Sequence, residues 1–141
     1  MVVAPGTSGR MTAVKLTGTP EVAVNVSYKG AFTTAGWTIK VGDNDTYYCP
    51  LEITVGKTTI KGAAYPNDQT GFEKAVNDAI AGCSKNYVAN TNLANQGADS
   101  LDVSWKWAFE GNDDVKDTAL GNLTTAPTVT LKITTTVTQI D

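Results

Sequence analysis

One stretch of the chain alternates so regularly that it limits what the chain can fold into. From Leu101 to Phe109 every second side chain is large and apolar, and polar or small side chains fall between. The apolar set is Leu101, Val103, Trp105, Trp107 and Phe109. A period of two in aromatic and branched residues predicts a β-strand with one buried face. At roughly 2 kcal/mol per large side chain, this face contributes on the order of 10 kcal/mol to a core before conformational entropy is subtracted.

Other parts of the chain also read as short strands separated by turn-forming residues. The expected strands are Met11–Leu16, Glu21–Tyr28, Trp37–Val41, Thr46–Val55, Thr58–Lys61 and Thr128–Ile140. We expect Lys29-Gly30 to end the second of them, and Pro50 to mark an edge or a bulge because proline cannot donate to a ladder. Cys83–Gly97 is polar and rich in asparagine, which predicts a loop.

Only one segment has a clear helical period. Between Gly71 and Ala81, apolar residues recur at intervals of three and four, the spacing of one helix face. They are Phe72, Ala75, Val76, Ala79 and Ile80. Asp68 or Thr70 is suited to cap the start of this helix. The whole pattern predicts an all-β protein, a jelly-roll-like β-sandwich with one inserted short α-helix, built as a single domain over residues 1–141. An immunoglobulin-like sandwich is the alternative.

Composition excludes several functions. The chain has 141 residues and a net charge of −3, with its basic residues scattered, so we expect no nucleic-acid partner. No run approaches the roughly 20 apolar residues that a membrane-spanning helix needs. The chain contains no histidine, the usual general base and the commonest transition-metal ligand. The weakly charged surface, rich in threonine, asparagine and glycine, favours an extracellular location.

Two groups of residues are candidate structural sites. Cys49 and Cys83 either form a disulfide or remain two buried thiols. On the chain-entropy model, the loop closed by such a disulfide would stabilise the folded state by roughly 3.8 kcal/mol. The acidic stretch Glu110–Asp117 offers oxygen ligands of the kind that Ca²⁺ prefers. The candidate ligands are Asn112, Asp113, Asp114 and Asp117. Their spacing does not match the EF-hand pattern, so a solvated acidic loop is the favoured interpretation.

The three tryptophans allow two interpretations. Trp37, Trp105 and Trp107 could form an aromatic platform for sugars. The strand alternation instead places Trp105 and Trp107 on the same face as Leu101 and Val103, which favours core packing. An exposed Trp37 would support sugar binding.

Short motifs follow one another along most of the chain. They are Val3-Ala4-Pro5-Gly6-Thr7-Ser8-Gly9, Thr17-Gly18-Thr19-Pro20-Glu21-Val22, Tyr48-Cys49-Pro50-Leu51, Trp105-Lys106-Trp107, Asp117-Thr118-Ala119-Leu120-Gly121 and Thr138-Gln139-Ile140-Asp141. In this order they resemble the TasA/camelysin group, secreted proteins of Gram-positive bacteria whose signal peptides need a dedicated signal peptidase. The resemblance implies a jelly-roll subunit of extracellular matrix fibres. Such subunits polymerise when the N-terminal segment of one fills a strand gap in the next.

The resemblance also has limits. Little precedes Ala4-Pro5-Gly6, so we expect the donor segment to be Met1, Val2 and Val3 or a longer native segment. Camelysins have been described as metallopeptidases, but a chain without histidine has no HExxH zinc site, and two cysteines do not complete one. We therefore expect no catalytic metal, no cofactor and no enzyme activity.

These observations predict a secreted structural subunit of an extracellular or cell-surface fibre of a biofilm matrix. We expect self-association as its main interaction and other matrix or cell-wall components as further partners. The alternative is a small extracellular binding module, for carbohydrate among other ligands. The long Thr128–Ile140 strand has one charge, Lys132, and its nearest proline, Pro127, precedes it. Either this strand pairs centrally in a sheet, or its free edge is an assembly surface.

Overall fold

Antiparallel strands make up most of the computed structural model, which describes residues 6–95, 101–107 and 114–140. The strands are β1 (Ser8–Ala13), β2 (Val24–Ala35), β3 (Thr38–Val41), β4 (Asn44–Tyr47), β5 (Leu51–Val55), β6 (Thr58–Lys61), β7 (Lys85–Tyr87), β8 (Asp102–Trp107) and β9 (Thr128–Gln139). Two α-helices, α1 (Gln69–Ala81) and α2 (Asp114–Gly121), and 3-10 turns at Gly62–Ala64 and Leu93–Asn95 complete the elements. The expected all-β sandwich with an inserted helix is confirmed.

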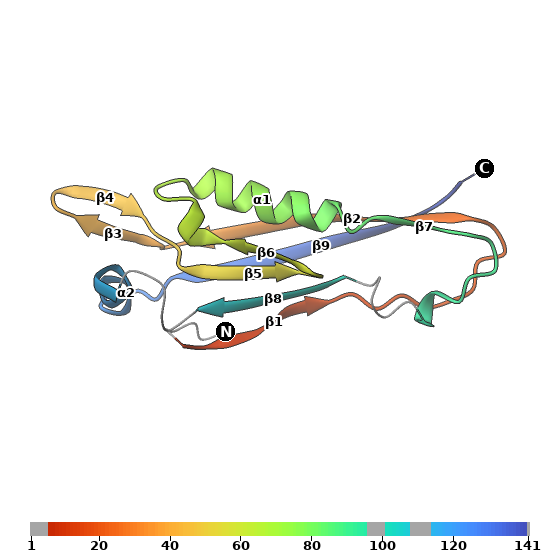
Figure 1. Ribbon diagram of the computed structural model, residues 1–141, viewed down its shortest axis with the longest axis horizontal. Coiled ribbons are helices and arrows are strands. Elements are labelled where there is room, and N and C mark those ends of the chain that lie inside the picture. Colours follow the sequence, from red (N-terminus) through yellow and green to blue (C-terminus); the bar gives the residue numbers. More distant parts are fainter. Residues whose placement is uncertain (1–5, 96–100, 108–113, 141) are drawn as a thin grey trace.

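The strands form three sheets. One has the order β1-β8-β5-β6, the second has the order β7-β2-β9, and β3 and β4 form a separate hairpin. The two larger sheets run along the long axis of an elongated molecule (Figure 1). Helix α1 lies along β2, and α2 sits at one end, beside the β3–β4 hairpin (Figure 1).

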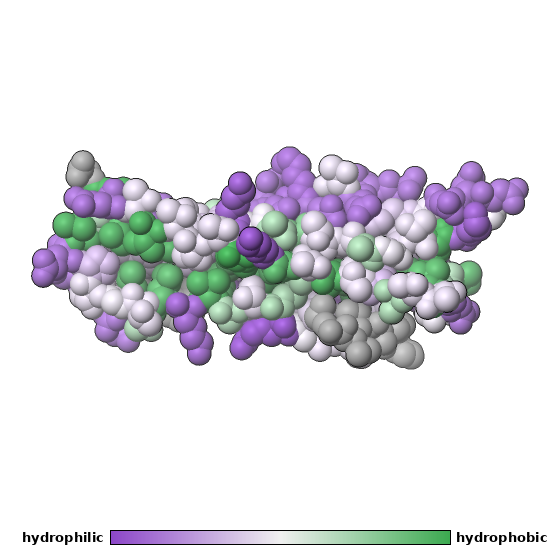
Figure 2. All heavy atoms as spheres, turned by 180° about the vertical axis from the view of Figure 1, so that it is seen from behind, coloured by the Kyte–Doolittle hydropathy of each residue, from purple (hydrophilic) through white to green (hydrophobic). Residues whose placement is uncertain are grey.

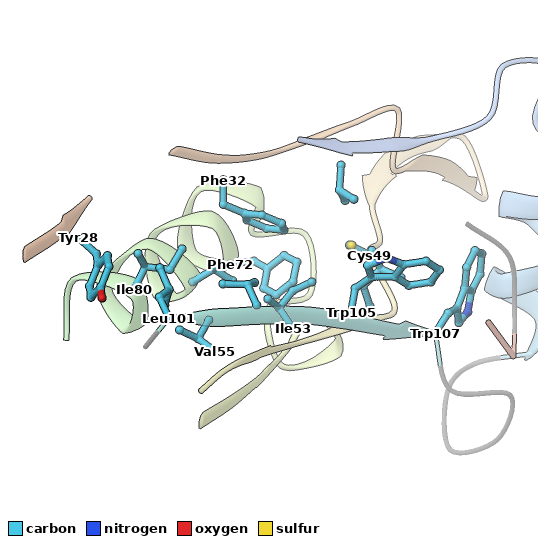
Figure 3. Close-up of a cluster of buried hydrophobic side chains, with 14 of the residues drawn as sticks. Tyr28, Phe32, Cys49, Ile53, Val55, Phe72, Ile80, Leu101, Trp105 and Trp107 are labelled. Atoms are coloured by element: carbon cyan, nitrogen blue, oxygen red, sulfur yellow. The ribbon is translucent and has the colours of Figure 1, made fainter. Parts of the chain in front are cut away.

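One hydrophobic core joins the sheets and α1. Phe72, Val76 and Ile80 of the helix are all fully buried, and Figure 3 shows the first and last of them among side chains of β2, β5 and β8. The ring of Phe72 meets that of Phe32 edge-on at a centroid distance of 5.6 Å. Trp105 and Trp107 of β8 are 4% and 2% exposed, so the prediction that they belong to the core is confirmed.

Strand β2 is longer than predicted, because Lys29-Gly30 does not end it. Gly30 lies in the middle of the strand, where α1 crosses closely. A Cβ added at Gly30 would lie 2.5 Å from Cδ1 of Ile80 and 3.1 Å from Oδ1 of Asn77. Glycine in a strand marks such close approaches. Gly30, which suggested the end of the strand, is therefore needed because a larger residue would not fit beneath the helix.

Three further expectations need correction. The predicted Thr46–Val55 strand is two strands, β4 and β5, separated by the buried link that contains Pro50. The predicted loop Cys83–Gly97 contains a short strand, β7, which pairs with the start of β2. The end of the predicted acidic loop is the first half of α2.

Candidate assembly edge

The second sheet ends in a long edge strand. β9 pairs with β2 over all 12 of its residues, from Thr128 opposite Ala35 to Gln139 opposite Val24, without a register shift. In the part of the chain that the structure describes, no strand pairs with the other edge of β9. Of the two arrangements that the sequence left open, the structure therefore shows the edge strand.

The hydrogen bonds of β2 show which backbone groups of β9 face outward. The N–H groups of Tyr28, Phe32 and Thr34 donate to side chains on the α1 side of β2, away from β9. Opposite residues of an antiparallel ladder exchange either both hydrogen bonds or none. The opposite residues on β9 are Thr135, Leu131 and Val129. These residues, and by the same alternation Ile133 and Val137, direct their N–H and C=O groups to the open edge.

Four of these residues, Val129, Leu131, Ile133 and Val137, form an apolar flank that the molecule covers only in part. All but Ile133, which lies opposite the partly buried Gly30, lie opposite buried residues of β2, so the flank shares the core-facing side of β2. Yet exposure rises along β9, from the buried Val129 through the half-buried Leu131 and Ile133 to Val137, which is 52% exposed. Figure 2 shows the molecule from behind, with separate patches of hydrophobic surface along its length. A row of unpaired backbone groups beside exposed apolar side chains is the surface that an added strand needs.

The other described edges carry features that discourage pairing. β1 has a register shift between Arg10 and Thr12, and Arg10 forms an exposed ion pair with Asp102. β6 and β7 have only four and three residues. The β3–β4 hairpin carries an ion pair between Lys40 and Asp45. Bulges, charges and short length are the usual means by which edges avoid association. β9 carries one charged residue, Lys132, whose side chain points to the opposite face from Leu131 and Ile133.

The segment expected to donate a strand, Met1, Val2 and Val3, lies outside the described residues. The described chain begins beside β8. The N–H of Gly6 donates to the carbonyl of Trp107 at 2.8 Å, and the N–H of Trp107 donates to the carbonyl of Thr7 at 2.9 Å. Gly6 and Thr7 therefore lead into β1 along the edge of β8.

The structure changes the interpretation of the acidic stretch. Asn112 and Asp113 lie outside the described residues, and Asp114 begins α2. Asp117 is 7% exposed, and its Oδ1 accepts a 2.8 Å hydrogen bond from the hydroxyl of Tyr48. Its carboxylate therefore holds α2 against the link between β4 and β5 and is not available in a solvated calcium loop. Among the described residues, no cluster of three or more acidic or cysteine side chains could hold a metal ion.

The sequence left open a disulfide or two buried thiols, and the structure shows two free thiols, of which Cys49 is buried and Cys83 is partly buried. Cys49 lies near the start of α1, where the N–H of Asn67 donates to the carbonyl of Tyr47 at 3.2 Å. Cys83 lies just beyond the end of α1 and donates its thiol proton to the carbonyl of Ala79. A helix of 13 residues is roughly 20 Å long, whereas bridged Cα atoms lie within about 7 Å. The helix therefore holds the two thiols apart.

Burial sets the chemistry of the groups near Cys49. It raises the pKa of the Cys49 thiol from 9.0 to about 12 and raises the pKa of the Tyr47 hydroxyl as well. Both groups therefore stay neutral at ordinary pH. The Tyr47 hydroxyl shares a 2.8 Å hydrogen bond with the hydroxyl of Thr34. These groups are part of the packed interior and offer no reactive nucleophile.

The tryptophans do not form a sugar platform. Trp37, whose exposure would have supported one, is 1% exposed. Its indole N–H donates to the carbonyl of Thr128 at 2.9 Å, and its ring packs edge-on against Trp107 at 5.7 Å. This contact fixes the start of β9 to the core. The aromatic platform is therefore wrong for all three tryptophans.

Two sets of contacts in the fold do not follow from apolar periodicity. Gln69, Glu73 and Asn77 recur every four residues and contact β2, but as polar residues they leave no mark on the apolar pattern that predicts the helix. The Tyr48–Asp117 pair joins residues 69 positions apart, which nothing local in the sequence reveals.

Neither described helix is long and apolar enough to cross a membrane. Comparison of the chain with models of protein families, with curated proteins and with solved structures gave no match.

Proposed function

We propose that this protein is a structural subunit of a secreted fibre, of the kind that forms a bacterial biofilm matrix, and that subunits join by β-strand addition at β9. The observation that carries this proposal is the open edge of β9, 12 residues long and without a bulge, beside the partly exposed side chains of Leu131, Ile133 and Val137. The motifs that resemble the TasA/camelysin group support the same role, which is structural and not enzymatic.

The chemistry of the edge suits a short apolar donor. Each outward N–H or C=O that gains a partner contributes about 0.5–1.5 kcal/mol. Val2 and Val3 of a second copy, or a longer native segment that precedes them, would add apolar contact at the partly exposed flank of β9. Strand addition of this kind takes its affinity from the main chain and its specificity from alternate side chains.

Negative-stain microscopy of the secreted protein with its native N-terminus tests the proposal. We expect fibres from this protein, and folded monomers after deletion of the residues before Pro5 or after replacement of Val2 and Val3 by proline. Replacement of both valines by isoleucine is the matched control, since it keeps the apolar character and the N–H groups, and it should leave fibres intact. A protein with its native N-terminus that stays monomeric at high concentration would contradict the proposal.

A second candidate is a small extracellular binding module. It rests on a depression of about 250 Å³ that Tyr47, Tyr48 and Tyr65 line together with Lys116. This volume lies below the usual range of roughly 300–1,000 Å³ for ligand sites, so it suits at most a single sugar ring. Titration with monosaccharides, read by the chemical shifts of these tyrosines, tests this candidate. Shift changes confined to this depression would favour it over the fibre.

A further inference from the structure

Helix α1 occupies the position of a neighbouring strand along the second half of β2. Glu73 Oε2 accepts from the N–H of Thr34 at 2.6 Å, and Asn77 Oδ1 accepts from the N–H of Phe32 at 2.9 Å. Gln69 Nε2 donates to the carbonyl of Thr34 at 2.7 Å. Beyond the helix, Ser84 Oγ accepts from the N–H of Tyr28 at 3.3 Å. Backbone groups that would pair with a strand are thus paired with side chains.

The match follows from geometry. Four residues of an α-helix rise about 6.0 Å, and two residues of a strand span about 6.7 Å. The spacing of side chains at every fourth helix position therefore matches the spacing of every second residue in a strand that runs beside the helix. Glu73 and Asn77 follow this match, because they bond Thr34 and Phe32 in antiparallel order. Gln69, one turn earlier, bonds the carbonyl of Thr34. The adjacent stripe of Phe72, Val76 and Ile80 holds the helix in the core.

The cover continues beyond the helix as a true strand. β7 pairs with β2 from Lys85 opposite Val26 to Tyr87 opposite Val24. The segment from Gln69 to Tyr87 therefore follows the β2 edge from Thr34 to Val24, first with side chains and then with backbone. Figure 1 shows α1 and then β7 along this side of β2. In the described part of the chain, nothing comparable covers β9.

We propose that α1 limits the protein to one strand-docking edge. The polar stripe of Gln69, Glu73 and Asn77 closes the second edge of the sheet, so that growth occurs only at β9 and produces an unbranched fibre. A molecule whose stripe no longer holds β2 has two edges open to strands of other copies. This inference rests on the proposed strand addition, but its structural part is tested in the isolated subunit.

The test compares two double substitutions on the same helix. Glu73→Ala with Asn77→Ala removes the two side chains of the polar stripe that accept from N–H groups of β2 and keeps Gln69. In Lys74→Ala with Asp78→Ala, one position further along, only an exposed ion pair is lost. Amide exchange in the monomer should be roughly tenfold faster at Phe32 and Thr34 in the first variant and unchanged in the second. The single variant Asn77→Ala, which should affect Phe32 alone, serves if the double variant does not fold.

Assembly is the second measurement. The stripe variant should form wide, laterally associated aggregates, whereas the wild type and the Lys74/Asp78 variant form fibres of one width in electron micrographs. Unchanged exchange at Phe32 and Thr34 would overturn the inference, and so would faster exchange with fibres of unaltered width. If no variant and no wild-type protein assembles, the fibre proposal fails, and with it the claim that α1 limits growth. Faster exchange would then show only that the stripe covers the β2 edge.

Discussion

Val26 and Val137 face each other across the β2–β9 ladder, but Val26 is fully buried and Val137 is 52% exposed. The difference arises because α1 and β7 cover the far side of β2, whereas β9 is the last strand of its sheet. The two paired valines thus show that the sheet is covered at the β2 edge and open at the β9 edge. Growth at β9 alone depends on this asymmetry.

Proline at Thr135 should block assembly without unfolding the subunit. The N–H of Thr135 faces the open edge, so its loss removes no bond to β2, and proline is tolerated on such edges. We expect the free energy of unfolding of Thr135→Pro to lie within about 1 kcal/mol of the wild-type value. The variant should nevertheless remain monomeric in sedimentation experiments. Thr135→Ala, which keeps the N–H, should polymerise normally. Normal fibres from the proline variant would place the docking edge elsewhere.

Substitution of either core tryptophan of β8 should be strongly destabilising. Trp105→Ala and Trp107→Ala each remove a buried indole, and we expect a loss of about 3–5 kcal/mol in denaturant unfolding. Lys106→Ala, between them on the exposed face, should change stability by at most about 0.5 kcal/mol. Equal effects at the three positions would contradict the core assignment.

Removal of the hydroxyl should affect stability differently at two buried tyrosines. The Tyr48 hydroxyl donates to Asp117, so Tyr48→Phe leaves a buried carboxylate with one bond fewer and should cost about 1–3 kcal/mol. The Tyr28 hydroxyl is buried and has no partner among the described residues, so Tyr28→Phe should be neutral or stabilising. Thermal unfolding of both variants measures this. A larger loss from Tyr28→Phe would show that its hydroxyl has a partner.

Stability should fall in alkaline solution. Burial holds the pKa of Cys49 at about 12, so above pH 9.0 the unfolded thiol ionises while the folded thiol remains protonated. The contribution of the protonated Cys49 thiol to the free energy of unfolding is therefore complete below pH 9.0, and it is lost as the pH rises toward 12. The raised pKa of Tyr47 acts in the same direction. Urea unfolding across this interval should show a smaller fall for Cys49→Ala than for wild type, and equal slopes would refute the assignment.

Patterns within single segments predicted much of the fold. The alternation from Leu101 and the threonine-rich alternation from Thr128 each gave a strand, β8 and β9, nearly in its observed bounds. The helical stripe around Phe72 gave α1 to within two residues at its start, with Asp68 as its cap. Long periodic segments are decided by local pattern, because one face must be buried whatever the neighbours are.

Features that depend on distant contacts could not be predicted in this way. Gly30 resembles a strand end until Ile80 is known to pack on it, and Asp117 resembles a solvated ligand until Tyr48 is known to bond it. The open edge of β9 was one of two alternatives for the same reason. Whether a strand lies at an edge depends on the order of strands in the sheet, which the sequence of a single strand does not determine.

Hydrogen exchange along β9, compared between monomer and assembled protein, tests whether strands are added at this edge. In the monomer, the outward amides of Ile133, Thr135 and Val137 should exchange rapidly, while those of Thr134 and Thr136, which face β2, should be protected. In the fibre, the outward amides should become as protected as the inward ones. Outward amides of β9 that remain fast in a well-formed fibre would contradict strand addition at this edge.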